Sequence, residues 1–149
     1  MGFPRLAKRG YILVADGARA KLLSNLGTAE EPDLRVVREY AQDNPVNSQQ
    51  GSERPGRLSD GASLHRSAVE ETDYHRLAKD RFAAMLVGEL EGLASEGKLR
   101  QCILVAPPQV LGTLRKAVGA QLASCVIGDV NKDLTTHEER EIARIVLGT

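Results

Sequence analysis

Three aspartates lie near the ends of apolar segments that are typical of buried strands. Asp16 directly follows one such segment, and Asp129 and Asp133 lie near the end of a later one. Carboxylates at strand ends of a mixed sheet can hold Mg²⁺ for phosphodiester hydrolysis if they converge on metal ions about 4 Å apart. A metal-dependent nuclease is therefore one function that the residue types allow.

Two of these aspartates also have a simpler structural interpretation. Asp16 precedes Gly17, and Asp-Gly is a strong turn dipeptide because the Asp side chain bonds the nearby backbone. We expect that turn, with Arg19 pairing with Asp16 across it. Lys132 and Asp133 follow a predicted strand end, where ligands often bind in α/β sheets, but Asp133 would also suit the dipole of a following helix. The sequence leaves both roles of Asp133 open.

The chain has three histidines, His65, His75 and His137. Asp73 and His75 at a helix start could meet His65 as metal ligands, but their spacing matches no standard zinc or di-metal pattern. We expect His137 to be exposed near the start of the last helix. The sequence also lacks a serine nucleophile elbow, a phosphate-binding loop and a dinucleotide fingerprint. We therefore predict no metal, no cofactor and no catalytic residue.

A polar segment at 43–72 has no apolar periodicity and contains several glycines and arginines. A segment of this length without secondary structure is usually functional or disordered, and the sequence leaves both open. We expect a flexible loop whose arginines contact phosphates and whose glycines allow close backbone approach, although acidic residues dilute its charge. The predicted partner-binding residues are Arg54, Gly56, Arg57, His65 and Arg66.

The overall composition excludes several classes of protein. Lys and Arg number 20 and Asp and Glu number 20, so no global field attracts nucleic acid or anionic lipid. An aromatic content of 3% argues against a stacking platform for single-stranded nucleic acid. The apolar runs are too short to span a bilayer, and no secretory apolar region follows the basic amino terminus. Because Cys102 and Cys125 read as buried thiols, we predict a cytoplasmic protein with no membrane partner.

The apolar pattern predicts one α/β domain over all 149 residues. Three early runs favour strands, the first two joined as a hairpin. We then expect a helix that starts at Thr72 or Asp73 and ends at Gly97, with Met85 in its buried stripe. A buried strand, a helix after a Pro-Pro pair, a last strand and a capped helix follow. The order β-β-β-α-β-α-β-α implies a mixed sheet covered by helices.

Two helix features are more specific. The second helix has a predicted core stripe that includes Leu111, Leu114 and Ala117. The last helix is preceded by the sequence 135–138, whose Thr and Glu have capping-box spacing.

Five stretches, taken together and in order, resemble the bacterial family of proteins described as required for attachment to host cells. They cover the chain nearly end to end, and their joint order carries the resemblance. The stretches are YILVADGARA at 11–20, PGR at 55–57, DYH at 73–75, VAPP at 105–108 with LG at 111–112, and KDLT at 132–135.

This host-attachment family is in turn similar to the middle domain of eukaryotic-type peptide-chain release factors. The similarity implies an α/β domain of RNase H-like topology and a ribosome or tRNA partner. In release factors, the loop before the long helix carries Gly-Gly-Gln, whose Gln is directed at the peptidyl-transferase centre. The matching loop here contains Gln49-Gln50-Gly51, and this departure argues against peptidyl-tRNA hydrolysis.

We therefore predict a non-catalytic module that binds the ribosome or another RNA-containing partner through the 43–72 loop. The alternatives are a nuclease that uses Asp16, Asp129 and Asp133, and a protein-binding adaptor in host attachment. A cleft is predicted around Asp16, Arg19, Asp73, His75, Lys132 and Asp133.

Overall fold

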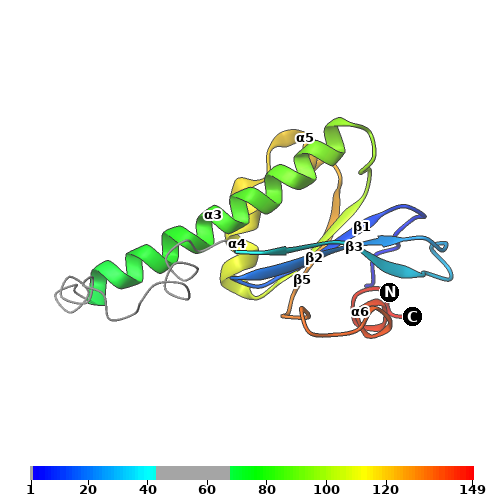
Figure 1. The fold of residues 1–149 in the computed structure, drawn as a ribbon. Helices are drawn as coiled ribbons and strands as arrows, with labels where there is room; N and C mark the ends of the chain where they lie inside the picture. Colours follow the sequence, from blue (N-terminus) through cyan, green and yellow to red (C-terminus); the bar gives the residue numbers. More distant parts are fainter. Residues whose placement is uncertain (1, 43–67) are drawn as a thin grey trace.

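The structure, a computed structural model, describes residues 2–42 and 68–149, with side chains described from residue 74 onward in the second range. Its strands form one sheet of order β3-β2-β1-β4-β5 (Figure 1). β1 pairs antiparallel with β2, and β2 with β3, whereas β1, β4 and β5 are parallel. The predicted mixed sheet is confirmed. The strands are β1 (Tyr11–Ala15), β2 (Arg19–Asn25), β3 (Leu34–Ala41), β4 (Cys102–Ala106) and β5 (Val126–Asn131).

Helices cover both faces of this sheet. One face packs against α3 (Ala68–Ser95), α4 (Pro108–Ala117) and the short α5 (Ala120–Ala123), and the other packs against α6 (Glu139–Leu147). The predicted order of elements is confirmed, and α5 is one helical turn that the sequence pattern did not indicate. The RNase H-like arrangement implied by the resemblance agrees with this sheet and its helices.

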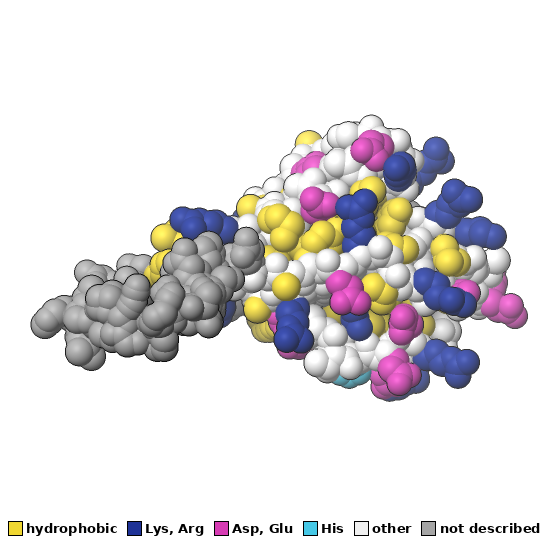
Figure 2. All heavy atoms as spheres, in the orientation of Figure 1, with side chains coloured by type: hydrophobic (Ala, Val, Ile, Leu, Met, Phe, Trp, Pro, Cys, Tyr) yellow, Lys and Arg dark blue, Asp and Glu magenta, His cyan; other side chains and the backbone are white. Residues whose placement is uncertain are grey.

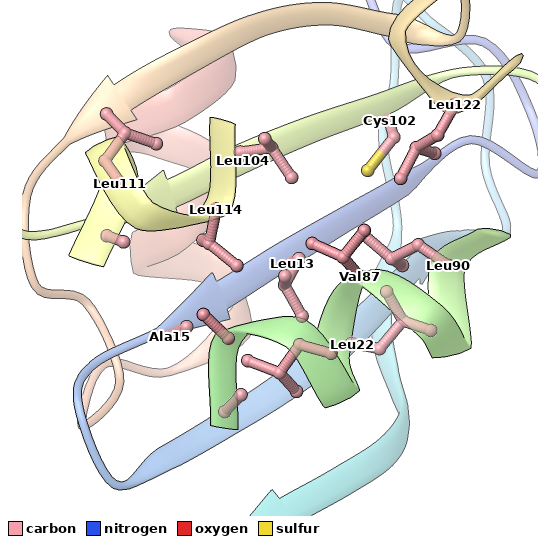
Figure 3. Packing of buried hydrophobic residues seen from close by; sticks show 14 of the residues in the cluster. Leu13, Ala15, Leu22, Val87, Leu90, Cys102, Leu104, Leu111, Leu114 and Leu122 are labelled. Carbon is pink, nitrogen blue, oxygen red and sulfur yellow. The ribbon is translucent and has the colours of Figure 1, made fainter. Parts of the chain in front are cut away.

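The two packing layers follow from the alternation of side chains along the central strands. Leu13 and Leu104 face α3 and α4, whereas Ile12 and Ile103 face α6, and all four are at most 1% exposed. Figure 3 shows Leu13 pointing toward Val87 of α3 in the first layer. Because both faces of β1 and β4 are covered, these strands read as continuous apolar runs rather than alternating ones.

The long helix α3 begins earlier than predicted and packs along only part of its length. It starts at Ala68 rather than at Thr72 or Asp73, so the last residues of the predicted loop are helical. Among its side chains described from Tyr74 onward, Phe82 is the first buried one, and the predicted core residue Met85 is 39% exposed. Its end is as predicted: Gly97 adopts a left-handed φ of 76°, which glycine accommodates without strain. Within the described ranges, no helix is long and apolar enough to cross a lipid bilayer.

Two further helix predictions are wrong in detail. Ala117, expected in the core, is exposed because α4 turns it away from the sheet, whereas Leu111 and Leu114 are buried as predicted. The capping box at 135–138 does not form. The helix starts at Glu139, so the residue before it is Glu138, which makes no side-chain capping bond, and Thr135 lies too far before the helix to cap it. The Thr135 hydroxyl instead lies within hydrogen-bond distance of Asp133 and Asp16.

A buried asparagine holds the chain together where β2 ends. Asn25 is 0% exposed, and its Nδ2 donates hydrogen bonds to the carbonyls of Leu6 (2.9 Å) and Thr28 (3.1 Å). Its Oδ1 accepts from the backbone N–H groups of Gly27 (2.9 Å) and Asp33 (2.9 Å). One side chain therefore satisfies the amino-terminal segment and the β2–β3 loop, which would otherwise bury unpaired backbone groups.

We predict that Asn25→Ala lowers the free energy of unfolding by about 3 kcal/mol, because it leaves several buried donors and acceptors unpaired. Urea denaturation followed by circular dichroism measures the change. Asn131→Ala, which truncates an exposed asparagine at the end of β5, should change stability by less than about 0.5 kcal/mol. Equal effects from the two substitutions would contradict the bridging role of Asn25.

Candidate functional site

The turn after β1 is organised by the carboxylate of Asp16. Its Oδ1 accepts hydrogen bonds from the backbone N–H groups of Ala18 (2.7 Å) and Arg19 (2.7 Å). This is the turn expected from Asp-Gly, and the contact with Arg19 is made by its backbone rather than by its guanidinium. The Oδ1 oxygen of Asp16 therefore stabilises the β1–β2 turn.

The other oxygen of Asp16 faces the segment after β5. Asp16 Oδ2 lies 3.3 Å from Thr135 Oγ1, and Asp133 Oδ1 lies 2.7 Å from the same hydroxyl. Asp133 Oδ1 also accepts the backbone N–H of Thr135 at 3.1 Å. A hydroxyl has a single proton, so it donates to one of the two carboxylates at a time. We call Asp16, Asp133 and Thr135 the Asp–Thr–Asp cluster; the structure brings the two predicted aspartates together there.

Neighbouring side chains hold this segment in place. Leu134 is 3% exposed and packs into the core beside α6. Lys21 of β2 donates from Nζ to the backbone oxygen of His137 at 2.8 Å. His137 is half-buried and precedes α6, contrary to the expectation of an exposed helical residue, and its buried Nδ1 has no hydrogen-bond partner among the described residues. Lys132 is exposed, and in the sequence it directly precedes Asp133 of the cluster.

Sequence reasoning missed the parts played by Lys21 and Thr135. A lysine between the apolar residues Ala20 and Leu22 of a strand does indicate a polar position, but not which carbonyl it meets. Thr135 belonged to the KDLT stretch, and only the fold shows that its hydroxyl joins two loops.

The third aspartate of the nuclease hypothesis lies elsewhere. Asp129 of β5 pairs with Arg115 of α4, with Oδ2 and Nη2 2.6 Å apart, on the face that α3 and α4 cover. The Asp–Thr–Asp cluster lies instead beside the α6 face, where Leu134 packs. Among the residues with described side chains, no three His, Cys, Asp or Glu residues are grouped to hold a metal ion. The structure therefore does not assemble the three carboxylates that two-metal hydrolysis needs.

The helix α3 passes over the Asp16 turn. Gly17 lies so close to Lys79 that a Cβ on Gly17 would stand 3.2 Å from the Lys79 Cε atom. His75 lies one helical turn before Lys79, is exposed, and makes an edge contact with Tyr74, with ring centroids 5.9 Å apart. The backbone of Asp73 lies in α3, and its side chain lies outside the described part of the chain.

The predicted partner-binding residues of the loop also lie outside the described residues. This applies to Arg54, Gly56, Arg57, His65 and Arg66.

The two thiols differ in accessibility. Cys102 of β4 is 0% exposed, and burial, reinforced by nearby Cys125, raises the pKa of its thiol from 9.0 to about 12. A thiol with that pKa is protonated at neutral pH and is a poor nucleophile. Cys125 is half-buried, with its sulfur 3.7 Å from the carbonyl oxygen of Leu99. The burial predicted for Cys102 is confirmed, and that of Cys125 is partial.

The comparison with protein families agrees with this fold. A family model described as bacterial archaeo-eukaryotic release factor family 12 matches residues 9–146, which is nearly the whole chain. A search of curated proteins finds no match to the chain.

We predict that Asp16→Ala lowers the free energy of unfolding by about 1 kcal/mol, because two turn N–H groups lose their acceptor. Asp16→Asn should cost clearly less, since the amide oxygen can accept the same two bonds. Urea midpoints of both variants test the prediction. An Asn variant as unstable as the Ala variant would show that the charge of Asp16, rather than its acceptor oxygen, stabilises the turn.

The raised pKa of Cys102 predicts a specific loss of stability at alkaline pH. In the unfolded chain the thiol ionises at its ordinary value of 9.0, whereas in the folded chain it stays protonated up to about 12. Stability should therefore fall as the pH rises from about 9 to about 12, with a slope approaching one proton per molecule. Chemical denaturation across this range, compared with Cys102→Ala, isolates the contribution.

The matched control is Cys125→Ala, whose thiol is less buried. It should keep the alkaline slope of the unmodified protein, whereas Cys102→Ala should flatten it. Identical slopes in all three proteins would contradict the assignment to Cys102.

Proposed function

Because the chain belongs to family 12 of the bacterial archaeo-eukaryotic release factors, we propose that it is a non-catalytic module that docks on the ribosome or another RNA-containing partner. We assign docking to the segment 43–67 and the amino-terminal half of α3. In that segment the proposed phosphate contacts are Arg54, Arg57 and Arg66. Gly56 and His65 are the sequence neighbours of Arg57 and Arg66 and complete the proposed set.

The observation that carries this proposal is the reach of α3 beyond the sheet. The helix has 28 residues, and of its described side chains, from Tyr74 onward, the first buried one is Phe82. At a rise of 1.5 Å per residue, the half before Phe82 is about 20 Å long. Figure 1 shows this half projecting past the strands and the other helices. Among the described residues of this half, Lys79 lies against Gly17 of the Asp16 turn, and the helix continues toward its amino-terminal end beyond that contact. A helix that extends past its own sheet in this way is suited to contact a partner.

The described side chains of this projecting half favour an anionic partner. Arg76, Lys79 and Arg81 are exposed, and Asp80 is the one acidic residue among the described side chains of this half. The same half also contains Glu70, Glu71 and Asp73, so the basic surface is confined to the turns from Arg76 to Arg81. Figure 2 shows Lys and Arg side chains along this part of α3. Basic side chains on a helix are a common means of positioning a protein on phosphates, and the sequence that precedes α3 contains further arginines. Leu77, which is 52% exposed, adds an apolar contact.

The non-catalytic part of the proposal rests on two further points. The segment before α3 contains Gln49-Gln50-Gly51 where release factors carry Gly-Gly-Gln. In the Asp–Thr–Asp cluster, the polar atoms are engaged with one another and with the turn backbone. We therefore propose that the domain occupies a release-factor-like site without hydrolysing peptidyl-tRNA.

We predict that the protein co-sediments with ribosomes at low salt and dissociates steeply as salt rises. Replacing Arg76 and Arg81 by Ala should weaken binding and lower the slope of log affinity against log salt by about one for each phosphate contact removed. A variant with Ala at Arg54, Arg57 and Arg66 should do the same. Sedimentation through a sucrose cushion over a salt series measures both quantities.

The control removes the same charge from another surface. Arg5 and Arg144 are exposed and pair with Glu30 and Glu141 near the amino terminus and on α6, so a double Ala variant there should bind ribosomes normally. Absence of the protein from the ribosome pellet at low salt, or equal loss in the control, would refute the proposal.

The sequence also suggested a protein-binding adaptor in host attachment, and the same experiment separates this alternative. An adaptor would leave the ribosome fraction unoccupied and would be insensitive to the arginine variants. For the nuclease alternative, the separation of Asp129 from Asp16 and Asp133 removes the argument from three converging carboxylates.

A further inference from the structure

A second basic surface lies at the other end of α3. A groove of about 950 Å³ opens where the loop after α3 meets the segments that lead into β1 and out of β2. Lys8, Arg9, Lys98 and Arg100 line it, and the described residues that line it include no Asp or Glu. Figure 2 shows Lys and Arg side chains gathered at this end of the molecule, opposite the grey residues. Because the chain as a whole has zero net charge, these four cations form a local excess of positive charge rather than part of a generally basic surface.

The cationic side chains of the groove are available to a ligand. All four are exposed. Lys98 lies 3.3 Å from Glu96, but both side chains are more than half exposed, and an ion pair of that kind is weak and easily exchanged. The groove is also lined by Leu26 and Val37, which are 50% and 47% exposed. The groove thus combines cationic and apolar side chains.

Arg9 is held in a backbone conformation that arginine rarely adopts. Its φ is 71°, and it is the one described non-glycine residue with a positive φ. The backbone N–H of Arg9 donates to Asn25 O at 2.6 Å, and that of Gly10 donates to Ala7 O at 2.9 Å, which fixes the turn. Glycine would adopt the same geometry without strain, so an arginine at this position costs some stability. Such outliers are typical of functional positions.

Several backbone donors around the groove are already used within the protein. The N–H groups of Arg9, Gly10 and Tyr11 all donate within the protein, as do those of Gly97 and Lys98. The four exposed cations that line the groove, with no carboxylate among its described lining residues, favour recognition through charge, and Leu26 and Val37 add apolar contact. An extended polyanion whose phosphates are joined by sugars with exposed C–H groups fits this pattern.

We propose that this groove binds the sugar–phosphate backbone of RNA without base specificity. Lys8, Arg9 and Arg100 contact phosphates, and Leu26 and Val37 lie against ribose. The low aromatic content excludes base stacking as the main interaction, which leaves recognition by shape and backbone. The site is distinct from the proposed ribosome-docking surface, because it lies beyond the carboxyl end of α3, roughly 30 Å along the helix from Arg76.

The test uses the full chain and a fluorescently labelled RNA duplex of about 12 base pairs, a length that fits within one dsRNA-binding footprint. Arg100→Ala and Arg9→Gly should each weaken binding about tenfold, as expected for loss of a charge-assisted contact. Arg9→Gly should at the same time melt at an equal or higher temperature, because glycine relieves the strained φ. A residue with only a structural role would not give this combination.

The double variant with Ala at Arg5 and Arg144 is the matched control and should bind the duplex normally. The proposal is overturned if Arg9→Gly and Arg100→Ala leave the affinity unchanged, if the control loses as much, or if polyglutamate of equal charge binds as tightly as RNA. Ribosome sedimentation is scored separately with the α3 variants, so the groove can fail while the proposed function stands, and the reverse.

Discussion

The burial of β1 and β4 on both faces is the constraint on which the rest of this structure depends. Both strands are apolar throughout, so one layer of helices must cover each face of the sheet. The βαβ connections place α3 and α4 on one side, and α6, which follows the last strand, covers the other. The candidate surfaces are then found at the two ends of the sheet and on the projecting half of α3. Every candidate surface lies in one of these places.

The Asp–Thr–Asp cluster and the basic surfaces differ in what they can do. In the cluster, each carboxylate already serves a turn or a neighbouring hydroxyl, so its first role is to join the β1–β2 turn to the segment before α6. The basic side chains on α3 and in the groove are exposed and have aliphatic surface beside them. α3 extends from one end of the sheet to the other, so the projecting half and the groove, which lies beyond the carboxyl end of the helix, are at opposite ends of the molecule (Figure 1). If both proposals hold, the helix separates two sites for an extended polyanion.

The sequence predicted the features that depend on the hydrophobic pattern. It did not predict the features that depend on a particular side-chain hydrogen bond. Strand and helix order, the burial of Cys102 and the turn at Asp16 followed from pattern and turn chemistry. The starts of α3 and α6 did not follow from the pattern. α3 begins within a polar stretch, and the hydroxyl of Thr135 contacts two carboxylates instead of capping α6. Nor could spacing show that Asp129 would pair with an arginine on the opposite face. The groove joins segments that are remote in sequence, so only the fold brings its charges together.

Contact between the projecting half of α3 and ribosomal RNA is the central claim, and photocrosslinking tests it most directly. A photoreactive benzoyl-phenylalanine would replace Leu77, which is 52% exposed on that half, or, as a control, Ile127, which is 37% exposed on β5. After irradiation with ribosomes, we expect position 77 to crosslink to ribosomal RNA and position 127 to give background. Crosslinking at background level from position 77, or equal crosslinking from both positions, would contradict the account.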